Sequence, residues 1–89
     1  MENFKNQTPI EPVIIIVTDD LVIDYPIRSI TVDNDGDNDG LLNGKVIKAG
    51  KAYTFVAGDN GYYKANTFTI SPIAAEEAPA TTFTVLINK

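Results

Sequence analysis

The sequence predicts an all-β fold: a small antiparallel β-sandwich or barrel, of the jelly-roll or Ig-like kind, with about seven short strands. Three observations support this prediction. Short runs rich in Val, Ile, Thr, Tyr and Phe follow one another, and most of them alternate polar with apolar residues. Turn residues such as Asn-Gly separate the runs. No stretch keeps an apolar period of 3.6 residues, so no helix of ordinary length is expected.

The first predicted strand, residues 13–17, is apolar at every position, and we expect other parts of the protein to cover both of its faces. The later runs are residues 21–23, 28–32, 45–48, 53–56, 67–70 and 82–87. In residues 53–56, Tyr53 and Phe55 share one face. Alternation in the other runs predicts these core side chains: Ile30, Val32, Phe68, Ile70, Phe83, Val85 and Ile87.

The segments between these runs indicate tight turns. Asn43-Gly44 and Asn60-Gly61 supply residues that tolerate a positive φ, as two-residue hairpin turns require. Residues 71–80 contain Pro72 and Pro79, and the six residues between these prolines have room for a single helical turn, which is not stable alone.

The length of 89 residues predicts one domain. Residues 1–12 are polar and contain two prolines, so we expect a flexible N-terminal arm followed by a single β domain over residues 13–89. A core this small, without a disulfide, is expected to gain stability from a bound ion or from a partner subunit.

The composition excludes several classes of function. The chain has no Cys and no His, which rules out disulfides, thiolate or imidazole metal sites, and catalytic triads built on those residues. Its net charge of -5 argues against nucleic acid as a partner. The sequence shows no secretory signal, and its longest apolar run has five residues, so no membrane span is expected.

The most distinctive local feature is an acidic segment between two predicted strands, residues 33–44. Its carboxylates are those of Asp33, Asp35, Asp37 and Asp39. Ca²⁺ prefers oxygen ligands, and alternating Asp residues followed by Gly allow a tight loop to direct them inward. These four Asp residues and Asn43 are therefore the candidate metal ligands, and Ca²⁺ is the candidate cofactor.

From Asp35 onward the spacing resembles the calcium loops of EF-hands and dockerins, with Gly40 in the sixth position and Asn43 in the ninth. The twelfth position, where an acidic ligand closes such a site, is Val46, and the flanking elements are strands rather than helices. Asp33 could replace the missing ligand. Two other interpretations stay open: a solvated turn that binds no metal, and an acidic contact surface.

Enzymatic activity is not predicted. The other paired acids, Asp19-Asp20 and Glu76-Glu77, are adjacent in sequence, so on a strand they would point to opposite faces. A glycosidase needs two carboxylates at a defined separation in a cleft. We therefore interpret both pairs as solvated turn residues.

The order of three short segments resembles small β-rich virion proteins of bacteriophages. The segments are Ser-Ile-Thr-Val-Asp-Asn at 29–34, Lys-Ala-Gly-Lys at 48–51 and Gly-Tyr-Tyr at 61–63. The likeness spans residues 29–70, and the Asp-rich loop that directly follows Asp33-Asn34 is an addition to that pattern. The resemblance implies a non-enzymatic capsid decoration, penton, spike or minor tail protein, located in the virion. It also implies a homo-oligomer whose partners are other virion proteins or copies of itself.

Two hypotheses follow from the sequence. The first is a structural component of a virus particle that acts by oligomeric assembly. The alternative is a calcium-stabilised β-sandwich that serves as a binding or adhesion module.

Overall fold

The computed structural model describes residues 12–89, and every regular element in this range is a β-strand. The predicted N-terminal arm, residues 1–12, lies outside the described residues except for Pro12. The strands are β1 (Val13–Val17), β2 (Leu21–Val22), β3 (Ser29–Asn34), β4 (Gly40–Leu42), β5 (Lys45–Ile47), β6 (Ala52–Val56), β7 (Thr69–Ser71) and β8 (Phe83–Asn88). The all-β prediction is confirmed. Within residues 12–89, no helix is long and apolar enough to cross a membrane.

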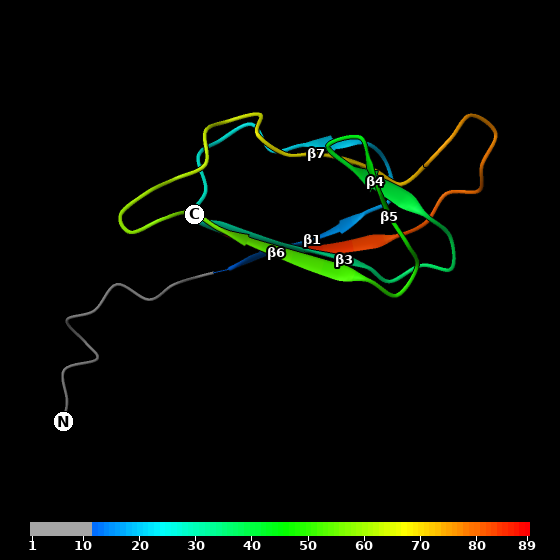
Figure 1. Ribbon diagram of the computed structural model, residues 1–89, viewed down its shortest axis with the longest axis horizontal. Helices are drawn as coiled ribbons and strands as arrows, with labels where there is room; N and C mark the ends of the chain where they lie inside the picture. Colours follow the sequence, from blue (N-terminus) through cyan, green and yellow to red (C-terminus); the bar gives the residue numbers. More distant parts are fainter. Residues whose placement is uncertain (1–11) are drawn as a thin grey trace, which may run out of the picture.

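The strands form two antiparallel sheets that face each other across the core (Figure 1). Sheet A has the order β1-β8-β3-β6 and sheet B the order β2-β7-β4-β5. The protein is therefore a small β-sandwich. Among these eight strands, β4 and β5 are the only two that follow each other in the sequence and lie in the same sheet. Each of the other connections along the chain crosses from one sheet to the other. The edge strands are β1 and β6 in sheet A, and β2 and β5 in sheet B.

Alternating side chains of both sheets build one hydrophobic core. The buried apolar residues are Val17, Ile23, Ile27, Ile30, Val32, Leu42, Ile47, Phe68, Ile70, Phe83, Val85 and Ile87. All seven core residues predicted from the alternation are among them. Phe68 lies at the centre of an aromatic group, with ring centroids 5.5 Å from that of Phe55 and 5.0 Å from that of Tyr63. Phe55 and Tyr63 are partly buried and pack against the core next to Phe68, which directly precedes β7.

Strand β1 differs from the prediction that both of its faces are covered. Its inward residues contact the core, but Ile14 and Ile16 are 64% and 61% exposed. The prediction was wrong because no third layer packs on the outer face of sheet A among the described residues. An apolar run shows that a strand favours burial, whereas the number of packed layers decides whether both of its faces are covered.

Residues 12–89 contain eight strands, and the one not predicted is β4, which lies inside the acidic segment. It forms a hairpin with β5 through Asn43 and Gly44, whose φ angles are 52° and 80°, as expected for this turn. Asn60 also has a positive φ, and the Gly61 amide closes its turn by donating to the Gly58 carbonyl oxygen at 2.7 Å. Residues 71–80 form turns rather than a helix beyond β7.

Candidate functional site

A buried side-chain amide, that of Asn34 at the end of β3, is a central attachment of the acidic segment to the sandwich. Its Nδ2 atom donates to the carbonyl oxygens of Asn38 and Ile47, both at 2.9 Å. Its Oδ1 atom accepts from the Gly36 amide at 3.1 Å and from the Thr81 hydroxyl at 2.6 Å. The side chain can make four hydrogen bonds and makes all four. It therefore joins the segment, β5 and the approach to β8 at one point.

The main chain of Asn34 and the close packing of Gly36 complete this attachment. The Asn34 amide donates to the Lys51 carbonyl oxygen and its own carbonyl oxygen accepts from the Gly50 amide, both at 2.9 Å. A Cβ atom at position 36 would overlap the side chain of Thr81. Glycine is thus required at position 36 by close packing, independently of any bound ion.

Two of the predicted ligands, Asp33 and Asp35, lie beside each other on the outer side of sheet A. Asp33 is directly across from Thr84 in the β3–β8 ladder, and the Thr84 hydroxyl donates a hydrogen bond to the Asp35 carboxylate. The pKa of Asp33 is raised, chiefly because partial burial removes water from its charged form. The charge of Asp35 and a hydrogen bond with it raise the pKa further.

The other predicted ligands lie apart from this pair. Asp37 and Asp39 are exposed. Asn43 is in the β4–β5 turn, where its Oδ1 atom accepts a hydrogen bond from the Thr69 amide at 2.8 Å. Strand β4 separates Asp39 from Asn43 by extended chain that spans about 13 Å over four residues. In a calcium loop, the same stretch would have to curl around the ion.

The described residues contain no group of three or more acidic side chains placed to hold a metal ion. Gly40, which occupies the sixth position of the calcium pattern, is buried against Phe83, whose ring a Cβ atom would overlap. Packing against β8 therefore accounts for this glycine. Calcium binding by the acidic segment stays a prediction.

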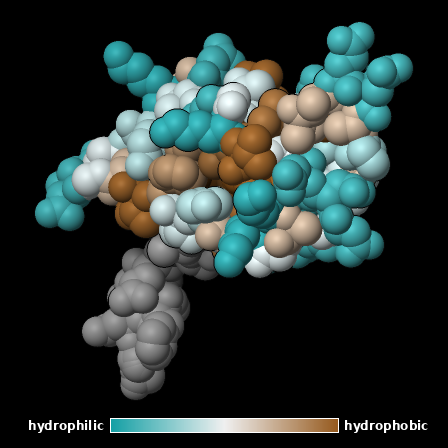
Figure 2. Space-filling view, turned by 45° about the vertical axis from the view of Figure 1, so that its right-hand side comes forward, coloured by the Kyte–Doolittle hydropathy of each residue, from teal (hydrophilic) through white to brown (hydrophobic). Residues whose placement is uncertain are grey.

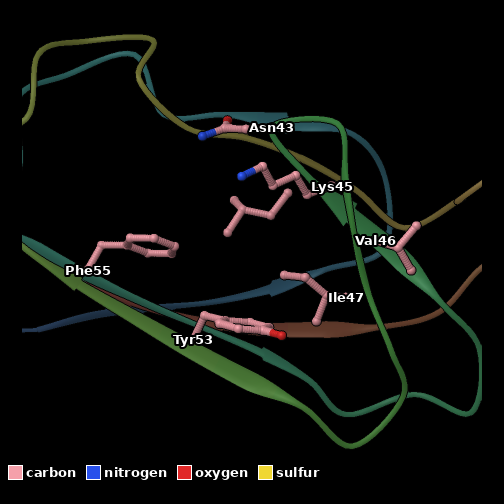
Figure 3. A pocket seen from close by; sticks show the side chains of 7 residues that line it. Asn43, Lys45, Val46, Ile47, Tyr53 and Phe55 are labelled. Atoms are coloured by element: carbon pink, nitrogen blue, oxygen red, sulfur yellow. The ribbon is translucent and has the colours of Figure 1, made fainter.

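A second feature is an apolar groove on the open side of the sandwich, between the β4–β5 hairpin and β6. Its volume is about 380 Å³, and it is lined by Leu42, Asn43, Lys45, Val46, Ile47, Tyr53 and Phe55. In Figure 3, the rings of Tyr53 and Phe55 rise from β6 on one side, and Asn43, Lys45 and Ile47 line the opposite side. Figure 2 shows apolar side chains gathered in the middle of the molecule with hydrophilic side chains around them.

The groove exists because β5 and β6 end their sheets on the same side of the core. The two strands are joined by the short turn that contains Gly50, with a φ of 78°, so they begin close together and then enter different sheets. Tyr53 faces inward across from Val32, yet it is 48% exposed because no strand bridges the gap above it. The lining residues include no carboxylate, so the groove offers apolar contact together with three polar side chains, those of Asn43, Lys45 and Tyr53.

Comparison with family models, with curated proteins and with solved structures finds no match to this chain.

Sequence reasoning missed both Asn34 and the groove. Asn34 could have been noticed from the strand pattern, because it continues the inward positions of Ile30 and Val32 in β3. A polar residue at a core position needs hydrogen-bond partners. The groove had only a partial signal, the shared face of Tyr53 and Phe55, because its other wall belongs to the second sheet.

Proposed function

We propose that this chain is a non-enzymatic structural component of a virus particle, such as a capsid decoration, penton, spike or minor tail protein, that acts by oligomeric assembly. One observation carries the proposal: exposed apolar side chains are concentrated on the edge strands of the two sheets. Six of the eight large hydrophobic residues exposed within residues 12–89 lie on the four edge strands: Ile14, Ile16, Val22, Val46, Tyr53 and Val56.

This distribution favours assembly over an isolated existence. A free edge strand offers unpaired backbone groups to other chains, and monomeric proteins commonly protect such edges with charges, prolines or bulges. Here Lys45 is the only charged residue within the four edge strands. Apolar side chains next to free backbone groups are the features that strand-to-strand docking uses.

The groove between β5 and β6 adds a surface suited to a protein partner. Its lining is mostly apolar, with the polar groups of Asn43, Lys45 and Tyr53 among the apolar side chains, and this mixture is typical of a protein–protein interface. The resemblance to virion proteins supports the choice of a virus particle as the assembly.

The experiment is co-assembly. The chain is produced together with the products of its neighbouring genes, and particles are separated by sedimentation and analysed by mass spectrometry. We expect the chain to sediment with the particles in a fixed ratio. A chain that stays at the top of the gradient while particles form would contradict the proposal.

A matched pair of variants tests the groove. Tyr53→Lys places a charge at the groove, and Ile73→Lys places the same charge on a loop residue of similar exposure, 46% against 48%. We expect Tyr53→Lys to reduce incorporation into particles and Ile73→Lys to leave it unchanged. Equal incorporation of the two variants would exclude the groove as the contact.

A further inference from the structure

The free edge of β1 is apolar along its whole length. All five residues, Val13 to Val17, are Val or Ile, and β1 pairs with β8 on one side only. Ile14 and Ile16 point to the outer face and are more than 60% exposed, while Val13 and Ile15 are partly buried against the core. The strand contains no charge, proline or glycine. Among residues 12–89, no strand pairs with its other edge, and its sequence has none of the residues that usually protect an edge strand.

We propose that β1 is a dimerisation edge, on which the β1 strand of a second copy pairs antiparallel about a two-fold axis at Ile15. The two copies of sheet A then form one continuous eight-stranded sheet. This inference deepens the proposed assembly function and rests on it, since it names the first partner as a second copy of this chain.

The pairing is set by strand geometry. In an antiparallel pair, residues directly opposite each other point to the same face. With the axis at Ile15, Ile14 of one copy faces Ile16 of the other on the outer side, and Val13 faces Val17 on the core side. Every apolar residue of β1 thus meets an apolar residue, and the outer and inner faces of the two sheets remain continuous.

The composition of β1 selects a second copy as the occupant. A two-fold contact brings each residue close to its own symmetry mate, so an interface on an acidic chain must avoid its carboxylates. The net charge is -5, yet β1 contributes none of it, and its sequence is apolar in both directions. The other edges are less suited: β2 has two residues, β5 carries Lys45, and β6 presents Thr54 on its outer face.

Sedimentation velocity over a wide concentration range tests this with the full chain. The variants are Ile14→Lys and Ile16→Lys, and the control is Val56→Lys on β6, the opposite edge of the same sheet, where the side chain is 68% exposed. We expect each Ile variant to raise the dimer dissociation constant by roughly a hundredfold or more, because the axis duplicates every substitution. The control should change it by less than about threefold. Far-UV circular dichroism verifies that all variants are folded.

Cysteine cross-linking tests the register, since the chain has no native cysteine. Ile14→Cys and Ile16→Cys proteins are oxidised alone and as a mixture. Positions 14 and 16 are opposite each other only between two copies, so we expect the mixture to form disulfide-linked dimers faster than either variant alone. Equal rates in all three samples would overturn the proposed register.

The outcomes separate this inference from the proposed function. A wild-type chain that stays monomeric at all concentrations overturns the β1 dimer, while co-sedimentation with particles would still support assembly. An oligomer that resists both Ile variants but dissociates in Val56→Lys also overturns it and assigns the contact to β6. Failure to enter particles, with an intact β1 dimer, would contradict the virion function alone.

Discussion

Replacement of Asn34 by Asp exchanges one buried amide nitrogen for an oxygen and tests how the acidic segment is held to the sandwich. In the native protein this nitrogen donates to the carbonyl oxygens of Asn38 and Ile47. In Asn34→Asp, an acceptor atom would face these two acceptors. The bonds that Oδ1 accepts from Gly36 and Thr81 would be kept. The substitution therefore removes two donated hydrogen bonds with little change in shape.

The expected loss follows from these two bonds. A buried polar group that loses its partner costs about 1–3 kcal/mol, so the two carbonyl oxygens predict a loss of about 2–6 kcal/mol in the free energy of unfolding. A domain of this size is expected near the lower end of the usual range, about 5 kcal/mol in total. Asn34→Asp should thus be barely folded at neutral pH.

The loss should also depend on pH. Burial and the two facing carbonyl oxygens favour the neutral form of the new carboxyl group, so its pKa in the folded protein should lie above the unfolded value of about 3.9. A raised folded-state pKa contributes stability below the unfolded pKa, and this contribution is lost as pH rises through the folded-state pKa. The deficit of the variant relative to wild type should therefore be smallest near pH 3, about one unit below that value, and grow toward neutrality.

Urea unfolding followed by far-UV circular dichroism measures the effect. The matched control is Asn38→Asp, which makes the same charge change in the same segment but loses only one bond, to the Ala80 carbonyl oxygen at 3.1 Å. This control should lose less than about 1.5 kcal/mol. If Asn34→Asp loses no more than the control, or if its deficit does not change with pH, the role assigned to the Asn34 amide is refuted.

Three further predictions concern the same end of the sandwich. Gly40→Ala places a methyl group against the ring of Phe83 and should cost about 1–3 kcal/mol in urea unfolding, whereas Gly58→Ala meets no atom within 4 Å and should cost less than about 0.5 kcal/mol; equal losses would contradict the packing argument. In a carbon NMR titration, the pKa of Asp33 should fall in Asp35→Asn, because a neighbouring charge and hydrogen bond are removed; an unchanged value would mean that burial alone raises it. Since the folded-state pKa of Asp33 is raised, its contribution to stability should be lost as pH rises above about 4, and Asp35→Asn should lose less over that range. Thermal melting with CaCl₂ or with EDTA tests the calcium alternative, since an ion held only by the folded state must raise the Tm; the alternative predicts a higher Tm in calcium, and equal Tm values would contradict it.

Much of the fold followed from local patterns, because a strand with one buried face records that face in its alternation. Ile30 and Val32 in β3, and Phe83, Val85 and Ile87 in β8, were predicted inward and are fully buried. The Asn43-Gly44 turn was predicted for a similar reason, since its backbone conformation restricts the residues that fit.

No local pattern in the sequence predicts the order of the strands within each sheet. The apolar run of β1 is typical of a central strand, yet β8 and β3 occupy the centre of sheet A. Strand β4 was missed because Gly40 begins it and acidic loop residues precede it. The calcium pattern assigned the function of the acidic segment to carboxylates at regular spacing in the sequence. The structural role in that segment belongs to the neutral Asn34, whose partners lie on β5 and on the approach to β8.

The central position of β8 has a consequence for how the chain folds. This strand is the last along the sequence, and it supplies the partner of both β1 and β3. Strand β1 therefore cannot pair within sheet A until β8 is present, because Val13 is paired with Ile87. Closing such long loops is entropically costly, and folds dominated by distant pairings fold slowly. Until β8 arrives, an uncharged Val-Ile-Ile-Ile-Val stretch is open to any neighbouring chain, so the yield of folded protein should depend on concentration and on the rate of synthesis.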